Sequence, residues 1–213
     1  MSFKITLIEK REFFEWVTAA PYSTVDNTGY FDNQATIDFV QMVNKDKVLG
    51  VNVTYEQAEL VEVVDSHTIM IKKINGGDLE KQEEELRFDY LALCTGSLIP
   101  YNDKAEDVYK IYSKDKKSQF YEKYRSQMDK AKSILVVGGG ATGVEAAGSI
   151  LLRYQDTKKV GIVSSGSSLL SGLPASAGKA AKEYFEKHGV NVHLDTKFNA
   201  SHKLKSEYEF IWN

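Results

Sequence analysis

The sequence is poor in cysteine, in proline and in long apolar runs. Its 213 residues include one cysteine, Cys94, and three prolines. A single cysteine excludes both an intramolecular disulfide and a CxxC redox pair, and it is typical of a reducing compartment. The few prolines and the lack of low-complexity tracts argue against long disordered segments. No apolar run approaches the roughly 18 residues of a membrane span, so we expect no transmembrane segment.

Neither sign of charge dominates the chain. It has 27 Lys and Arg against 30 Asp and Glu, for a net charge of -3. The basic residues are scattered instead of lying in a stripe, so we expect no nucleic-acid partner. The sequence shows no Ser-His-Asp pattern, no paired-carboxylate site and no metal-ligand spacing. We therefore predict no catalytic side chain and no metal site, and we look for binding residues.

The strongest motif is a glycine-rich turn between an expected strand and an expected helix. Residues 133–137 are short, apolar and rich in β-branched side chains, as in a buried parallel strand. A helix is expected from about residue 144 to residue 154. Between them lies the GxGxxG motif 138–143. This order is typical of a dinucleotide site, with the phosphates at the helix N-terminus.

Each glycine of the motif has an expected task. Gly138 permits the tight turn, Gly140 lets the backbone approach a pyrophosphate, and Gly143 lets the helix pack closely on the strand. A glycine turn kept only for packing is the alternative. The next expected strand, 159–163, ends where an NAD site often places an acid, but the residue there is serine, which leaves NADH versus NADPH open. The predicted NAD(P)H-binding residues are Gly138, Gly139, Gly140, Ala141, Thr142, Gly143, Glu145 and Ser164.

Three stretches in this order resemble a known family. They are KITLIEKREFF at 4–14, FDYLALCTGS at 88–97 and the fingerprint with its acid at 138–145. They are similar to flavoproteins with two dinucleotide-binding domains, in which an NAD(P)H domain is inserted into an FAD domain. The closest likeness is to the branch of apoptosis-inducing factor, ferroptosis-suppressor quinone reductases and type II NADH dehydrogenases.

The resemblance implies roles for residues that the motifs alone do not assign. Glu9 would bind the adenosine ribose of FAD, and the backbone of Leu60 would touch the adenine. The strand and turn at 88–97 would pass close to the FAD, with Cys94 as a small buried residue. The FAD-binding residues implied in this way are Glu9, Lys10, Leu60, Thr95 and Gly96.

The fold class expected is α/β, built of Rossmann-like three-layer units. A partial FAD domain, 1–112, would contain a β-meander with strands at 51–64 and 67–74. A connecting helix, 113–132, would lead to a nearly complete NAD(P)H domain, 133–213, whose last strand lies near 207–213. The aromatic face of the connecting helix is either a core face or a partner surface. The aromatic residues Phe13, Phe14 and Trp16 would lie near a flavin or quinone, or pack in the core.

The departures from the family bear on activity. The first strand, GxGxxG and helix of the FAD domain are absent, and so are the return to that domain and the C-terminal domain over the flavin. We therefore expect a chain truncated at both ends that binds NAD(P)H weakly and does not bind FAD stoichiometrically.

The function implied is a flavin-dependent NAD(P)H oxidoreductase, passing hydride to FAD and then electrons to a quinone, present as a fragment or degenerate copy. Whether this chain is an active enzyme stays open. The alternative is an inactive structural subunit, a pseudoenzyme whose truncated ends a protein partner covers. A nucleotide-sensing module without flavin lies between the two. The resemblance implies a mitochondrial or cytoplasmic location.

Overall fold

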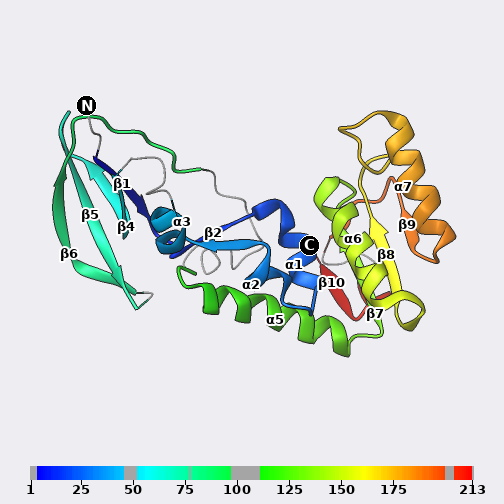
Figure 1. Cartoon of the computed structure of the whole chain (residues 1–213). Helices are drawn as coiled ribbons and strands as arrows, with labels where there is room; N and C mark the ends of the chain where they lie inside the picture. Colours follow the sequence, from blue (N-terminus) through cyan, green and yellow to red (C-terminus); the bar gives the residue numbers. More distant parts are fainter. Residues whose placement is uncertain (1–3, 46–51, 77, 97–110, 200–203, 213) are drawn as a thin grey trace. The chain divides into compact units, whose positions relative to one another are not determined.

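The chain folds as two compact units. The computed structural model describes residues 4–45, 52–76, 78–96, 111–199 and 204–212 (Figure 1). Unit one comprises Met1–Glu15 with Thr36–Ser118, and unit two comprises Trp16–Ala35 with Gln119–Asn213. The structure thus groups Trp16–Ala35 with the C-terminal residues, whereas the sequence placed all of 1–112 in one domain. The domain boundaries expected from the family stay a prediction.

Unit one is built on a four-stranded mixed sheet. Its strands are β1 (Lys4–Glu9), β4 (Asn52–Val63), β5 (Thr68–Asn75) and β6 (Asp78–Arg87), in the order β1-β4-β5-β6. Strand β1 pairs parallel with β4, and β4, β5 and β6 pair antiparallel, which confirms the predicted meander. A small apolar core forms on this sheet from Ala58, Ile69 and Ile71.

A short two-stranded ladder completes unit one. Strand β2 (Phe13–Glu15) pairs antiparallel with β3 (Thr36–Asp38), and α3 (Phe39–Lys45) follows. Side chains alternate across a strand, so Phe13 is fully buried and Phe14 is 46% exposed. Of the three aromatic residues near the start of the chain, Phe13 therefore packs in a core.

Unit two contains a parallel four-stranded sheet, and helix α6 connects strands β7 and β8 as in a βαβ unit. Its strands are β7 (Ser133–Val137), β8 (Lys159–Val163), β9 (Asn191–His193) and β10 (Phe210–Trp212), in the order β10-β7-β8-β9. All three pairings are parallel. The strands expected at 133–137 and 159–163 are confirmed residue for residue.

The helices of unit two differ from expectation mainly at their ends. Helix α6 (Ala141–Tyr154) begins inside the glycine motif, three residues earlier than predicted, because Gly140 is already its N-cap. Helix α7 is Ala175–Lys187. Strand β10 is shorter than the expected 207–213, because Glu207 ends the short helix α8 (Leu204–Glu207).

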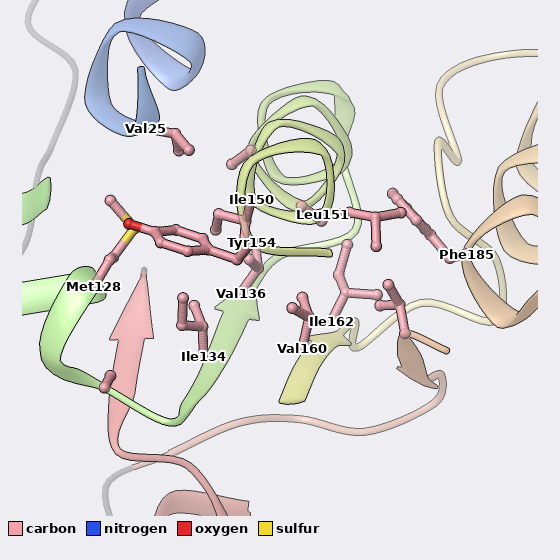
Figure 2. Close-up of a cluster of buried hydrophobic side chains, with 14 of the residues drawn as sticks. Val25, Met128, Ile134, Val136, Ile150, Leu151, Tyr154, Val160, Ile162 and Phe185 are labelled. Atoms are coloured by element: carbon pink, nitrogen blue, oxygen red, sulfur yellow. The ribbon is translucent and has the colours of Figure 1, made fainter. Parts of the chain in front are cut away.

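The core of unit two joins elements from distant parts of the sequence (Figure 2). Helix α1 (Ala20–Val25) contributes Val25, and α5 (Lys114–Lys130) contributes Met128. They pack with sheet residues such as Ile134 and Ile162 and with α6 residues such as Ile150, all of them fully or almost fully buried. The α5 face that carries Met128 is thus a core face of unit two. The α/β fold class is confirmed.

The stretch Asp89–Gly96 does not form the expected strand. It has no regular secondary structure, and all of its residues are exposed, with Tyr90 90% and Leu93 60% exposed. A strand needs a neighbour for its backbone hydrogen bonds, and no described strand pairs with this segment. The expectation that Cys94 is buried is therefore wrong, since the structure leaves it exposed. Ser97 lies outside the described residues.

Across the part of the chain that the structure describes, no helix combines the length and the apolar character that a membrane crossing needs.

Candidate functional site

The glycine motif forms a tight turn at the carboxyl end of β7. Gly138 has φ +123°, a conformation that side chains rarely adopt, and its N–H donates to the carbonyl of Val163 in β8 at 2.8 Å. A Cβ built on Gly143 would collide with the carbonyl oxygen of Gly138. The turn therefore requires glycine at both positions, as the sequence predicted from the tight turn at Gly138 and from close packing at Gly143.

Gly140 is different, because its surroundings are open. Its backbone is extended, with φ -76°, and a Cβ there would meet no atom within 4 Å. It is the N-cap of α6, yet no side chain caps the helix and no acid lies in its first turn. The N–H groups of Ala141, Thr142 and Gly143 thus have no partner within the helix and favour an anion. The space and the donors fit a phosphate group.

Ser164 lies directly beside this turn. A Cβ on Gly139 would stand 2.6 Å from the Ser164 Oγ, and Leu170 donates its N–H to the Gly139 carbonyl at 2.7 Å. The Ser164 side chain is buried and accepts the N–H of Gly166 at 3.2 Å. The structure therefore brings Ser164 to the glycine turn from the end of β8. Its proposed role beside an adenosine ribose stays a prediction.

A cavity of about 410 Å³ opens along α6 beyond the glycine turn. Three aromatic residues of the Trp16–Tyr30 segment line it, together with the face of α6 that carries Glu145. This aromatic pocket is lined by Trp16, Thr18, Ala19, Pro21, Tyr22, Tyr30, Glu145, Gly148, Ser149 and Leu152. The sequence singled out Glu145 and Trp16 but missed Tyr22 and Tyr30. Their signal is weak, because the two walls of the pocket are more than 100 residues apart in the sequence.

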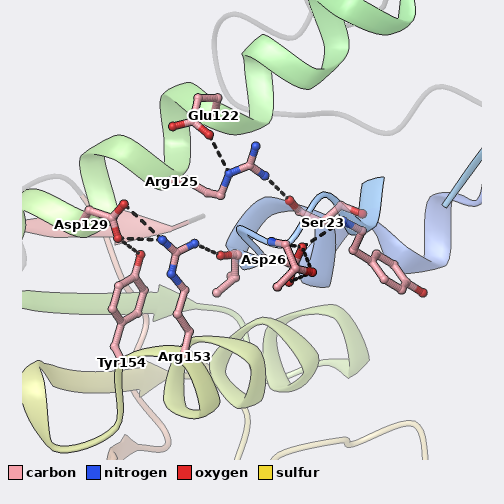
Figure 3. A network of polar contacts seen from close by, with 10 residues as sticks. Ser23, Asp26, Glu122, Arg125, Asp129, Arg153 and Tyr154 are labelled. Atoms are coloured by element: carbon pink, nitrogen blue, oxygen red, sulfur yellow. Dashed lines mark hydrogen bonds and ion pairs between the residues drawn. The ribbon is translucent and has the colours of Figure 1, made fainter. Parts of the chain in front are cut away.

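Two arginines fasten the aromatic segment to the rest of unit two (Figure 3). Arg125 of α5 donates through Nη1 to the carbonyl of Ser23 at 2.8 Å, and Arg153 of α6 donates to the carbonyl of Val25. These carbonyls lie at the C-terminal end of α1, where a helix lacks donors. Asp129 holds Arg153 at 2.9 Å and accepts the hydroxyl of Tyr154 at 2.8 Å. Burial, together with the hydrogen bond to Asp129, raises the pKa of Tyr154.

Asp26 shapes the chain between α1 and α2 (Tyr30–Asn33). Its carboxylate accepts the backbone N–H of Thr28 at 2.9 Å and that of Tyr30 at 3.0 Å. Burial would raise the pKa of Asp26, but these hydrogen bonds, with the charge of Arg125, outweigh it and lower the pKa. The ionised carboxylate thereby fixes the position of Tyr30 in the pocket wall.

The residues assigned to FAD by resemblance all lie in unit one. Glu9 ends β1, and its Oε1 accepts the backbone N–H of Arg11 at 3.1 Å. Lys10 forms an ion pair with Glu59 at 3.1 Å, next to Leu60. Thr95 and Gly96 belong to the exposed segment described above, and Gly96 has φ +68°.

A cradle for the FAD pyrophosphate is not found among the described residues. The sequence has one GxGxxG, and that motif belongs to unit two. Around Glu9, the described part of unit one offers strand ends and an exposed segment, with no helix that starts at a glycine turn. By themselves, the described residues fit the dinucleotide at Gly138–Gly143 and do not fit FAD.

Comparison with known proteins gives relatives over most of the chain. An oxidoreductase, ptaL of Pestalotiopsis fici, is 28% identical over 202 residues, which cover 92% of this chain and 50% of that protein. Ferroptosis suppressor protein 1 of Xenopus laevis is 35% identical over 132 residues, or 59% of this chain and 34% of that protein. The chain thus spans about a third to a half of the length of these curated relatives.

Solved structures share the fold. NDH2 of Plasmodium falciparum in complex with NADH superimposes with a TM-score of 0.61 at 24% identity, covering 90% of this chain and 43% of that one. The same protein in complex with RYL-552 gives a TM-score of 0.65 at 22% identity. The family model of the pyridine nucleotide-disulphide oxidoreductases matches residues 1–211. A match over almost the whole sequence, with a parallel βαβ unit and its glycine turn in place, shows that the chain belongs to the pyridine nucleotide-disulphide oxidoreductase family.

Proposed function

We propose that the chain binds NAD(P)H at the Gly138–Gly143 turn and acts as part of a flavin-dependent NAD(P)H oxidoreductase with a quinone as electron acceptor. The contrast between two glycines supports this proposal. Packing forbids a side chain at Gly143, whereas open space faces the uncapped start of α6 at Gly140. If the turn served packing alone, a residue with a side chain would fit at position 140 as well as glycine does. The names of the relatives, an oxidoreductase and ferroptosis suppressor proteins, support the same class of activity.

The residues of unit two divide the binding of the dinucleotide among them. The first-turn N–H groups and the dipole of α6 hold the pyrophosphate. Ser164 serves the adenosine ribose, and the pocket that Glu145 lines receives the nicotinamide end. When bound, NAD(P)H supplies the hydride, and the protein contributes position and exclusion of water. The described residues by themselves do not fit FAD, so the flavin would need residues beyond them.

Nucleotide binding tests this proposal directly. Titration calorimetry with NADH and with NADPH is expected to give saturable binding to the 213-residue chain. Gly140→Ala would fill the space before the helix and is expected to weaken binding at least tenfold (about 1.4 kcal/mol). Gly172→Ala is the matched control, because a Cβ there also meets no atom within 4 Å and Gly172 lies outside the site. Equal binding by the two variants, or no binding by the natural chain, would refute the proposal.

Flavin binding is tested separately. We expect the 213-residue chain to lack stoichiometric FAD, so a purified yellow protein with flavin absorbance near one per chain would contradict us. If the chain bound both FAD and NADH and reduced a soluble quinone with NADH, it would have the complete activity of a flavin-dependent oxidoreductase.

An inactive structural subunit is the second candidate. The exposed apolar side chains of Tyr90 and Leu93 favour it, because large exposed apolar groups in a row are typical of surfaces that a partner covers. Copurification with a stable partner, together with absence of any NADH or NADPH effect on the melting temperature, would establish this alternative.

A further inference from the structure

The carboxyl ends of three parallel strands meet at one edge of the sheet in unit two. Strands β7 and β8 pair parallel, and so do β8 and β9. The glycine turn follows β7, Ser164 follows β8, and Leu194 follows β9. Ligands of such sheets bind outside the carboxyl ends of the strands. A dinucleotide held at the glycine turn therefore has its adenosine end near the ends of β8 and β9.

The chain that follows β8 carries no charge. Ser164 is buried, and its Oγ accepts the N–H of Gly166 at 3.2 Å. Residues 164–174, which connect β8 to α7, include no acid and no base. A carboxylate at this place commonly binds the ribose 2′-hydroxyl of NADH, and a base accommodates the 2′-phosphate of NADPH. This segment by itself therefore does not discriminate between the two cofactors.

The end of β9 brings an acid to the same place. Asp195 donates its N–H to the carbonyl of Gly166 at 3.0 Å, and Thr196 donates its N–H to the carbonyl of Ser164 at 2.9 Å. These two bonds hold Asp195 beside the segment that follows β8. Asp195 is exposed and forms no ion pair with any residue in the described part of the chain. Its negative charge is thus presented to solvent beside the uncharged segment.

The backbone of Asp195 explains its size but not its charge. Its φ is +49°, in the left-handed region that few side chains adopt and that Asp, Asn and Gly tolerate. A role in the turn alone would be served equally well by a neutral asparagine. Substitution by asparagine therefore separates the turn from the carboxylate charge.

The base that lies nearest in the sequence, Lys197, belongs to a different part of the surface. It precedes Phe198, which packs against Leu135 and Val163. These two residues lie on the sheet face opposite the core that contains α6, because side chains alternate across a strand. The chain therefore turns onto that face just beyond Asp195, and Lys197 lies within this turn.

We propose that Asp195 selects NADH against NADPH. Its carboxylate accepts the ribose 2′-hydroxyl of NADH and repels the negatively charged 2′-phosphate of NADPH. The end of β9 thereby supplies the acid that the end of β8 lacks. This inference rests on the proposed binding of NAD(P)H at the glycine turn.

The test compares the two cofactors on the 213-residue chain. Calorimetric titration at low ionic strength is expected to show NADH binding at least tenfold more tightly than NADPH. Asp195→Asn fits the same φ and should lower this ratio at least threefold, mainly through tighter binding of NADPH. Asp195→Gly should lower it as well. Because salt screens exposed charges, added salt should reduce the ratio of the natural chain and leave that of Asp195→Asn unchanged.

Lys197→Gln is the matched control, because it removes a neighbouring charge of the opposite sign. It is expected to leave the preference for NADH at least as large as in the natural chain. Equal affinity of the natural chain for NADH and NADPH, or an unchanged ratio in Asp195→Asn, would overturn the inference. Tighter binding of NADPH that is lost in Lys197→Gln would also overturn it and would assign the specificity to that base.

Adenosine probes show that the preference arises at the ribose. 5′-AMP and adenosine 2′,5′-bisphosphate differ only in the 2′-phosphate, and neither contains nicotinamide. In competition with NADH, 5′-AMP should bind more tightly to the natural chain, and Asp195→Asn should remove this difference. If both dinucleotides bind equally well, this inference alone fails. If neither dinucleotide binds, the proposed function fails and the inference fails with it.

Discussion

Gly140 and Gly143 stand three residues apart in one turn, yet a methyl group has opposite consequences at the two positions. At Gly143 it would meet the carbonyl oxygen of Gly138, and backbone atoms cannot move aside as a flexible side chain can. At Gly140 it would enter open space in front of α6. A glycine required by packing and a glycine that faces open space can therefore be distinguished by substitution.

Stability is expected to follow this contrast. Gly143→Ala should lower the free energy of unfolding by about 1–3 kcal/mol, the usual cost of overpacking. Gly140→Ala should change it by less than about 0.5 kcal/mol, because its backbone is already extended. Urea unfolding of both variants followed by circular dichroism measures the difference. Equal stability of the two variants would show that the turn relaxes around Gly143.

At the scale of elements, unit two depends on helix α1, which lies more than 100 residues before strand β7 in the sequence. Helix α1 contributes Val25 to the core and presents its last carbonyls to Arg125 and Arg153. A helix of six residues is too short to be stable alone, so its position rests on these tertiary contacts. The same contacts position the aromatic wall of the pocket.

Removal of one arginine tests this attachment. Arg153→Met keeps the apolar stem but leaves the Val25 carbonyl without its charged donor, which is expected to cost about 1.5–3 kcal/mol. Arg153→Lys should recover part of that loss. Chemical unfolding gives the energies, and hydrogen exchange of residues 20–30 reports the position of α1. Normal protection of α1 in Arg153→Met would mean that Val25 packing and the Arg125 contact to the Ser23 carbonyl hold it without Arg153.

Asp26 makes the chain after α1 sensitive to acid. Its folded pKa is lowered, so its contribution to stability is complete above the unfolded value near 3.9 and is lost as the pH falls through the folded pKa. Asp26→Asn cannot ionise and accepts weaker hydrogen bonds, so it should be less stable by about 1 kcal/mol at pH 7. The gap between the two proteins should shrink between pH 5 and pH 2. A gap independent of pH would exclude this role of the carboxylate.

At the scale of the whole molecule, local sequence patterns predicted some strands with correct ends, and they also predicted one strand that does not form. Strands β7 and β8 were predicted from short apolar runs ending at glycine or serine, and buried parallel strands carry that signal in their own sequence. The segment Asp89–Gly96 has comparable apolar content, but a strand also needs a neighbour, which local sequence does not reveal. The aromatic pocket was missed because packing of α1 on α6 creates it.

The glycine turn itself was predictable because its three tasks all lie within six residues. The role of Gly140 and the place of Ser164 after the next strand were predicted from the strand–turn–helix order, whereas the burial of Ser164 against Gly139 was not. Glu145 was predicted from the motif, but its lack of an ion partner among the described residues depends on where Arg153 is bound. Sequence patterns thus predict the glycine turn better than the aromatic pocket.

Because each unit has its own sheet and its own core, we expect a core mutation in one unit to destabilise mainly that unit. Ile71 of β5 and Ile162 of β8 are both almost fully buried, one in each core. Each change to alanine is expected to cost about 2–5 kcal/mol. Hydrogen exchange should show Ile71→Ala losing protection mainly in β4, β5 and β6, and Ile162→Ala mainly in β7, β8 and α6. NADH should raise protection in the second group and leave the first unchanged. If either variant lowered protection equally in both sheets, or if NADH protected the meander, the two units would fold and bind as one.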